Sequence, residues 1–266
     1  MAKLNNHLDV IRILPKTNCK KCGLGTCLAF AVAVIQGTKV LSDCPDLDGG
    51  IIAEYQVRQV GRNKIEGDLE QIVGRLEEKV RRVDFASTPA RLGAKLTENG
   101  LAVTMLGKNF LVSREGGVES TCHTNMWLRI PLLNYVIRCR GREPSGQWMP
   151  LRELPGGADW GRFYEHRCEK PLKKIIDEYT NLFEIMIDVF QAQPAQAFDS
   201  DIAVVLHPLP KVPLLICYWK PEDGMDSDLS LFWDANAEDN LNIDSLYYLG
   251  VGMTAMFEKI ARTHGK

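Results

Sequence analysis

The sequence lacks any long hydrophobic run and any marked excess of charge of one sign. Its longest apolar stretch, CLAFAVAVI at 27–35, is far shorter than the about 20 residues that a membrane-spanning helix needs. The 34 acidic and 32 basic residues leave a formal net charge of −2, which gives little general attraction for nucleic acid or anionic membranes. The N-terminal MAKLNNHLDV has no hydrophobic segment after its lysine, unlike a signal peptide. We therefore expect a cytoplasmic protein with no membrane span and no nucleic-acid partner.

The sequence also lacks the motifs of several large enzyme classes. It contains no G-x-G-x-x-G or Walker phosphate loop, no H-E-x-x-H zinc motif and no G-x-S-x-G nucleophile elbow. These absences leave open whether the protein is an enzyme.

Four cysteines stand close together near the N-terminus. They are Cys19, Cys22, Cys27 and Cys44, spaced C-x2-C-x4-C-x16-C. In a reducing cytoplasm, clustered cysteines more often bind metal or do redox work than form disulfides. A short loop with three thiolates, joined by a fourth from elsewhere in the fold, suits a [4Fe–4S] cluster. Zinc is an alternative, although structural zinc usually shows two CxxC knuckles or a Cys/His mixture, and plain structural thiols are another.

The residues between these cysteines also favour a cluster. Gly23 and Gly25 let the backbone approach closely, so that amide N–H groups can point at cluster sulfurs. A helix is expected at 27–36 with Thr26 as its cap, and its N-terminal dipole would favour a negatively charged cluster. This helix is apolar all round, so we expect it to be buried.

The rest of the chain predicts an α+β fold. Asn-Gly and Gly-Lys turns between short apolar runs at 96–117 predict a β-hairpin or meander. Further strands are expected at 147–154, 201–209, 212–219 and 229–235, and helices at 51–85, 124–140, 160–190 (broken near Lys170-Pro171) and 243–262. Strands and helices do not alternate regularly, so we expect a small helical iron–sulfur module followed by a mixed α+β domain with a mainly antiparallel sheet. The expected boundaries are 1–50 for the module, 51–90 for a helical connector and 91–266 for the α+β domain.

Two further places could carry chemistry. Arg152 and Glu153 lead into the turn of RELPGG (152–157), which either cradles an anion or is closed by an internal ion pair. His207 ends a predicted strand, where a hydrogen-bonded structural histidine is the commoner case than a catalytic base.

A second metal site would have to use the remaining cysteines. Cys122-His123 precedes a predicted helix, and Cys139, Cys168 and Cys217 are scattered, so no pair has the spacing of metal ligands. Cys217 lies in an apolar strand and is expected to pack as a small hydrophobic residue.

The segment LPKTNCKKCGLGTCLAFAVAVIQGTKVLSDCP (14–45) resembles the four-cysteine [4Fe–4S] domain of the corrinoid iron–sulfur protein large subunit. It is similar, less closely, to the domain in the B subunit of Rnf-type electron-transport complexes. The resemblance implies that Cys19, Cys22, Cys27 and Cys44 are the cluster ligands. Lys20 and Lys21 stand where these domains more often have a small or acidic residue, a difference that bears on potential and partner.

A second resemblance covers about 90–262. SGQWMPLRELPGGADW (145–160), DIAVVLHPLPKVPLLICYWKPED (201–223) and LFWDANAEDNLNIDSLYYLG (231–250) are similar to a family of uncharacterised domains of anaerobic bacteria and archaea. Some of those proteins carry the same iron–sulfur module in front. The family has no established activity, so this resemblance implies no mechanism.

Three functions are compatible with these patterns. The first is electron transfer in anaerobic metabolism through one [4Fe–4S] cluster, with a corrinoid protein or ferredoxin as redox partner and with Lys20 and Lys21 as a cationic docking rim. The second is an interaction or scaffold protein, in which a cluster or zinc staples a module too small to be stable alone. The third is an enzyme that uses Arg152, Glu153 and His207.

Overall fold

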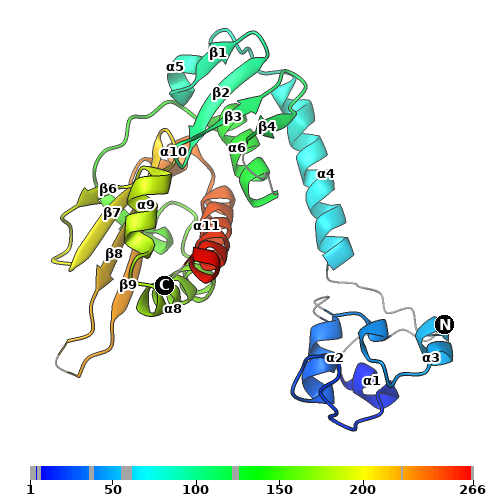
Figure 1. Ribbon diagram of the computed structural model, residues 1–266. Helices are drawn as coiled ribbons and strands as arrows, with labels where there is room; N and C mark the ends of the chain where they lie inside the picture. Colours follow the sequence, from blue (N-terminus) through cyan, green and yellow to red (C-terminus); the bar gives the residue numbers. More distant parts are fainter. Residues whose placement is uncertain are drawn as a thin grey trace. The chain divides into compact units, whose positions relative to one another are not determined.

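The computed structural model describes residues 4, 7–35, 39–54, 62–121, 126–222 and 224–264. The chain divides into two compact units, Met1–Ile72 and Val73–Lys266, and helix α4 (Arg62–Val80) runs across the boundary between them (Figure 1).

The first unit is built from short helices. They are α1 (His7–Ile13), α2 (Cys27–Ile35), the 3₁₀ turn η1 (Leu41–Asp43) and α3 (Gly49–Glu54). Helix α1 packs against α2, and the two contribute to one small core. The buried residues of that core are Leu4, Val10, Leu14, Phe30, Ala31, Val34, Leu41, Cys44 and Leu47.

Helix α2 occurs where the sequence predicts it, with one difference in burial. It spans Cys27–Ile35, and Gln36, the last residue of the predicted helix, lies outside the described residues. The hydroxyl Oγ1 of Thr26 accepts a hydrogen bond from the backbone N–H of Ala29 at 3.0 Å, which confirms the predicted cap. The expectation that α2 is buried on all sides is wrong, because Leu28 is 50% exposed. A unit this small can cover only part of an apolar helix.

The second unit begins with a four-stranded antiparallel sheet. Its strands, in spatial order, are β1 (Lys95–Thr97), β2 (Gly100–Met105), β3 (Lys108–Val112) and β4 (Val118–Ser120). Leu106 and Gly107 join β2 to β3 with φ angles of 48° and 72°. Two residues of positive φ give the tight turn that matches the twist of a hairpin. The predicted meander is therefore confirmed.

A five-stranded antiparallel sheet forms the centre of this unit. Its strands lie in the order β5-β9-β8-β7-β6, and they are β5 (Trp148–Pro150), β6 (Gln193–Ala195), β7 (Ile202–Leu209), β8 (Val212–Trp219) and β9 (Asp228–Asp234). Backbone N–H of Leu106 donates to the carbonyl oxygen of His207 at 3.0 Å, which ties the first sheet to the second.

Strand β8 is buried along almost its whole length because both faces of the sheet are covered. On one face, Phe198 stacks on Phe232 with ring centroids 4.5 Å apart. On the other face, Phe183 of α9 (Leu182–Phe190) lies 6.0 Å from the ring of Tyr218. Side chains alternate between faces along a strand, so cover on both sides explains why β8 is a continuous apolar run.

Figure 1 shows the helices that follow α4 in the second unit. They are α5 (Pro89–Leu92), α6 (Met126–Arg138), η2 (Leu151–Glu153), α7 (Gly161–Tyr164), the π-helical η3 (Glu165–Glu169), α8 (Lys170–Glu178), α9, α10 (Ala237–Asn240) and α11 (Ile243–His264). Helix α11 packs against both α6 and α8. Helix α6 contains Pro131 and still continues, as predicted.

Two local predictions need correction. The helical region 160–190 is not broken at Lys170-Pro171, because Pro171 lies in the first turn of α8, where a missing N–H costs little. The break follows at 179–181, between α8 and α9. The predicted strand at 147–154 is shorter, since the chain turns into η2 directly after Pro150.

The mixture of helices with antiparallel sheets confirms the predicted α+β class. Among the residues described above, no helix is long and apolar enough to cross a membrane.

Candidate metal centre

The first unit holds the four N-terminal cysteines on three neighbouring pieces of structure. Cys19 and Cys22 lie in the loop between α1 and α2, and Cys27 is the first residue of α2. Cys44 directly follows the 3₁₀ turn η1. Exposure differs among them: Cys19 is exposed, Cys22 and Cys27 are half-buried, and Cys44 is buried within the core.

The environment of Cys44 combines burial with charged and thiol neighbours. Burial raises the pKa of the Cys44 thiol, a backbone hydrogen bond from Asp46 lowers it, and the neighbouring Cys22 and Cys19 raise it further. Cys22 and Cys27 pack against the same core that contains Cys44. The fold therefore brings three of the four predicted ligands to one small core, and Cys19 lies in the loop that also carries Cys22.

The loop that carries Cys19 and Cys22 has an unusual backbone. Lys16, Asn18, Lys20 and Gly23 have φ angles of 58°, 50°, 61° and 81°. Three of these are not glycine, and such residues each cost of order 1 kcal/mol and persist only where the surrounding structure requires them. Left-handed residues interspersed in a loop turn successive N–H groups toward one side, as in the concave backbone sites that hold phosphates and iron–sulfur clusters.

Asn18, which the sequence motif does not single out, organises this loop. Its side-chain Oδ1 accepts a hydrogen bond from the backbone N–H of Cys27 at 2.7 Å. Its own backbone N–H points to the Sγ of Cys27 at 3.4 Å. Asparagine tolerates the left-handed conformation better than most residues, and an N–H donated to a ligand sulfur is one way in which a protein tunes such a site.

We expect Asn18→Ala to weaken this loop more than Asn18→Gly. Both changes remove the hydrogen bond to the first turn of α2, which costs about 1 kcal/mol. Only alanine adds the strain of a left-handed residue, roughly 1–2 kcal/mol more. The half-life of the visible cluster absorbance in air should therefore be shortest for Asn18→Ala. Equal half-lives in the two variants would contradict the backbone argument.

Lys21 is paired within the unit. Its Nζ lies 2.8 Å from Oδ1 of Asp46, and the two side chains are 59% and 30% exposed. The hydrogen bond and charge of Asp46 raise the pKa of Lys21, and the same contact lowers the pKa of Asp46. The expected cationic rim of Lys20 and Lys21 is thus narrower than the sequence suggests, because Asp46 offsets one of its two charges.

The chemistry of the donors suits an iron–sulfur cluster. Three of the four thiols come from the loop and the first residue of α2, the loop backbone is bent for close approach, and a Cβ placed on Gly25 would meet no atom beyond its chain neighbours within 4 Å. In the part of the chain that the structure describes, no three His, Cys, Asp or Glu side chains converge on the position of a single metal ion. The thiolates of a [4Fe–4S] cube bind four different irons, so they surround a body instead of meeting at one point.

The other candidate residues do not assemble into one site. Arg152 and Glu153 form the internal ion pair that was one of the two alternatives, at 3.6 Å between NH2 and Oε1. Arg152 also lines one pocket and His207 another, and the two pockets share no lining residue. Burial lowers the pKa of His207, which favours a neutral imidazole. The structure therefore does not support a joint site of Arg152, Glu153 and His207.

The cysteines of the second unit behave as buried structural groups. Sγ of Cys139 donates to the carbonyl oxygen of Arg91 at 3.2 Å. Burial raises the pKa of the Cys139, Cys168 and Cys217 thiols, so they remain protonated. The pair Cys122-His123 lies outside the described residues.

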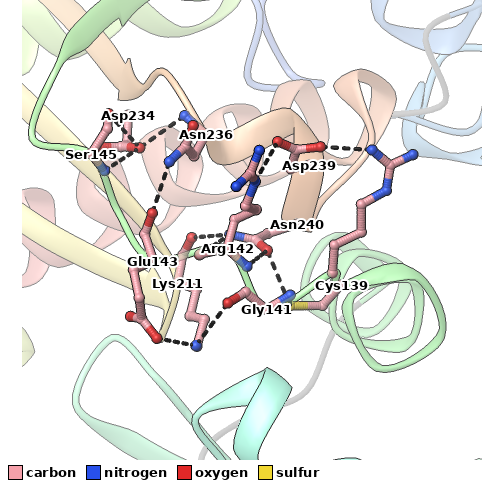
Figure 2. Close-up of polar contacts among 11 residues, drawn as sticks. Cys139, Gly141, Arg142, Glu143, Ser145, Lys211, Asp234, Asn236, Asp239 and Asn240 are labelled. Atoms are coloured by element: carbon pink, nitrogen blue, oxygen red, sulfur yellow. Dashed lines mark hydrogen bonds and ion pairs between the residues drawn. The ribbon is translucent and has the colours of Figure 1, made fainter.

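Several residues of the segment LFWDANAEDN (231–240) take part in a buried polar network (Figure 2). Asn240 is fully buried, and its Nδ2 donates to the carbonyl oxygens of Arg142 at 2.8 Å and Lys211 at 2.9 Å. Asp234 is 1% exposed and accepts hydrogen bonds from the backbone N–H groups of Ser145, Gly146 and Asn236. These contacts hold the irregular segment 139–147 beside β8 and β9, a structural role that the sequence patterns did not indicate.

Comparison with known proteins also divides the chain into two parts. A family model described as "Putative Fe-S cluster" matches residues 14–45, so the four-cysteine unit is an iron–sulfur cluster domain and the chain is an iron–sulfur protein. A second model, "Domain of unknown function (DUF3786)", matches residues 84–256, more than half of the chain. The chain belongs to this DUF3786 family.

The similar curated proteins match only the N-terminal part of the chain. Subunit gamma of the acetyl-CoA decarbonylase/synthase complex is 52% identical over 42 residues in Methanothermobacter thermautotrophicus, which is 16% of this chain and 9% of that protein. In Methanocaldococcus jannaschii it is 42% identical over 48 residues, 18% and 10% of the two chains. The chain thus spans about a tenth of the length of the curated relatives it matches. No solved structure matches it.

Proposed function

We propose that Cys19, Cys22, Cys27 and Cys44 ligate one [4Fe–4S] cluster and that this protein transfers single electrons through it. The C-x2-C-x4-C-x16-C spacing supports the ligand set, since three thiols come from one loop and the fourth from a separate turn. The similarity to subunits of the acetyl-CoA decarbonylase/synthase complex supports a role with protein partners. When bound, the cluster would supply reversible one-electron chemistry.

The main support for this proposal is that the four cysteines differ in how exposed they are. Cys19 is exposed at the surface of the unit, whereas Cys44 belongs to its core. An electron carrier needs one side of its redox group near the surface and the other side held firmly. The reducing cytoplasm is the compartment that best preserves such thiols.

Protein purified and reconstituted without oxygen should contain close to four iron and four sulfide per chain. It should also show an S = 1/2 signal by electron paramagnetic resonance after dithionite, and the signal should disappear on reoxidation. Values near two iron per chain, or stoichiometric zinc, would contradict the assignment. A cluster with full iron that neither dithionite nor ferredoxin reduces would favour a structural role instead.

The second candidate function of the metal site is purely structural: it would only stabilise the fold of the first unit. One observation favours it. Among the residues of the first unit that the structure describes, Cys44 belongs to a core of nine buried residues, and a unit with a small core gains much of its stability from a metal or another cross-link. In that case the second unit would provide the function, with no electron passing through the first.

The docking partner is proposed to be an acidic redox protein, either a low-potential ferredoxin that supplies electrons or a corrinoid protein that receives them. Lys20 is exposed beside Cys19, so its charge can speed association with an acidic surface. The charge of Lys21 is offset by Asp46.

Lys20→Glu is expected to slow anaerobic reduction by ferredoxin a few-fold at low salt, with an unchanged visible spectrum. The wild-type rate should fall as salt rises, because the Debye length shrinks to about 8 Å at physiological ionic strength. The matched control exchanges the pair, Lys21→Asp with Asp46→Lys, which keeps the local charge and should leave the rate nearly unchanged. Rates that respond to neither salt nor Lys20→Glu would rule out this docking surface.

A further inference from the structure

The second unit contains a pocket that the electron-transfer proposal does not use. It has a volume of ≈ 250 Å³ and lies between η2, α7 and η3. Its lining residues include Arg152, Arg162, Tyr164, Glu165 and Glu169. Ligand pockets for drug-sized molecules run from about 300 to 1,000 Å³, so this one would take a smaller, polar molecule.

An unusual backbone shapes one wall of the pocket. Residues Glu165–Glu169 form a π-helix, in which the backbone N–H of Lys170 donates to the carbonyl oxygen of Glu165, five residues earlier. Such wide turns are rare and are often found at functional sites. This turn places Glu165 and Glu169 on the same wall, next to Arg162 of α7.

The buried side of the pocket is held rigidly from behind. The hydroxyl of Tyr164, which is 2% exposed, accepts a hydrogen bond from Nε1 of Trp233 at 3.1 Å. Oε1 of Glu169 accepts the backbone N–H of Leu231 at 3.1 Å, so β9 fixes the position of this carboxyl group. Burial raises the pKa of Glu169, which means that the carboxylate lacks solvation and gains from a hydrogen-bond donor.

The charged side chains at the mouth of the pocket differ in whether they already have an ion-pair partner. Glu165 is paired with Lys170 at 2.8 Å, and Arg152 lies 3.6 Å from Glu153. Among the residues that the structure describes, no ion pair or hydrogen bond engages the guanidinium of Arg162. A guanidinium with all its donors available binds carboxylate or phosphate groups well, often through two parallel hydrogen bonds.

We propose that this pocket binds a small molecule that carries both an oxyanion and a donor group. Its carboxylate or phosphate would contact Arg162, with Arg152 beside it, and its amine or hydroxyl would contact Glu169. The site lies wholly within residues 150–169 of the second unit, so none of its residues is one of the four N-terminal cysteines. The DUF3786 part of the chain would then act as a ligand-binding domain.

Isothermal titration of the full chain with four probes tests this proposal. O-Phosphoethanolamine and β-alanine carry an oxyanion together with an ammonium group, whereas inorganic phosphate and propionate carry the oxyanion alone. Each molecule with both groups should bind at least about tenfold more tightly than its single-group partner, because a charge-assisted hydrogen bond is added. The stronger of the two pairs identifies phosphate or carboxylate as the natural oxyanion.

Three variants locate the binding. Arg162→Gln should abolish binding of all probes, and Glu169→Gln should remove the advantage of the molecules with an ammonium group while keeping an acceptor for Leu231. Arg167→Gln is the matched control. Arg167 is exposed and lies on the π-helix that carries Glu169, but its side chain does not line the pocket. No saturable heat with any probe, no gain from the ammonium group, or equal losses in Arg162→Gln and Arg167→Gln would each overturn the proposal.

Discussion

Cys44→Ser is expected to remove most of the iron from protein purified without oxygen, whereas Cys217→Ser is expected to leave the iron content unchanged. Cys44 lies in the core of the first unit, close to Cys19 and Cys22. Serine cannot replace the thiolate that an iron of the cluster requires, and loss of one of four ligands opens the cube. Iron analysis and the brown charge-transfer absorbance measure the effect directly.

Cys217 is a matched control because it is also buried but lies in the second unit. It packs in β8 with Ala203 and Leu215, away from the N-terminal cysteines in sequence. Serine at this position buries a hydroxyl group, which costs roughly 1–3 kcal/mol of stability without touching a ligand. Equal losses of iron in the two variants would contradict the assignment of Cys44.

Asp234→Ala is expected to lower the free energy of unfolding of the second unit by roughly 2–3 kcal/mol. The variant would leave the backbone N–H groups of Ser145, Gly146 and Asn236 without their acceptor (Figure 2). A hydrogen bond to a charged group contributes about 1.5–3 kcal/mol, and because Ser145 and Gly146 are exposed, their N–H groups regain part of this from water. Asp234→Asn keeps one oxygen acceptor and should therefore lose less.

Tryptophan fluorescence during urea unfolding can measure this effect selectively, since all five tryptophans lie between residues 127 and 233. Asp239→Ala provides the comparison. Asp239 pairs with Arg140 and Arg142, whose side chains are 74% and 67% exposed, and surface pairs of this kind contribute about 0–1 kcal/mol. A similar loss of stability in Asp234→Ala and Asp239→Ala would show that the network of Asp234 contributes little.

Strands and long helices of this protein were predictable because their signals are local. The runs predicted at 201–209, 212–219 and 229–235 correspond within one residue at each end to β7, β8 and β9. Turn residues bound each run, and the apolar content in between indicates burial. The final helix is predicted at 243–262 and spans Ile243–His264. It was predictable because its signals are also local.

The π-helix at Glu165–Glu169 was not predictable in this way. Nothing in the letters EHRCE marks a wide turn. Its geometry accompanies a hydrogen bond between Glu169 and Leu231, residues 62 positions apart in the sequence. The pocket beside it is therefore not predictable from the sequence, although the sequence marks Arg152 on its rim as a candidate for anion binding.

The sequence by itself determined the kind of cofactor that the first unit suits, because four thiols within 26 residues restrict the chemistry whatever the details of folding. It also determined the α+β class, since hydrophobic period and turn residues act over short distances. Only the tertiary structure decided that Asn18 supports Cys27, that Asp46 offsets the charge of Lys21, and that Asp234 holds a distant segment. Each of these depends on where the chain returns in space, and a polar side chain gives no sign in the sequence of which backbone group it will meet.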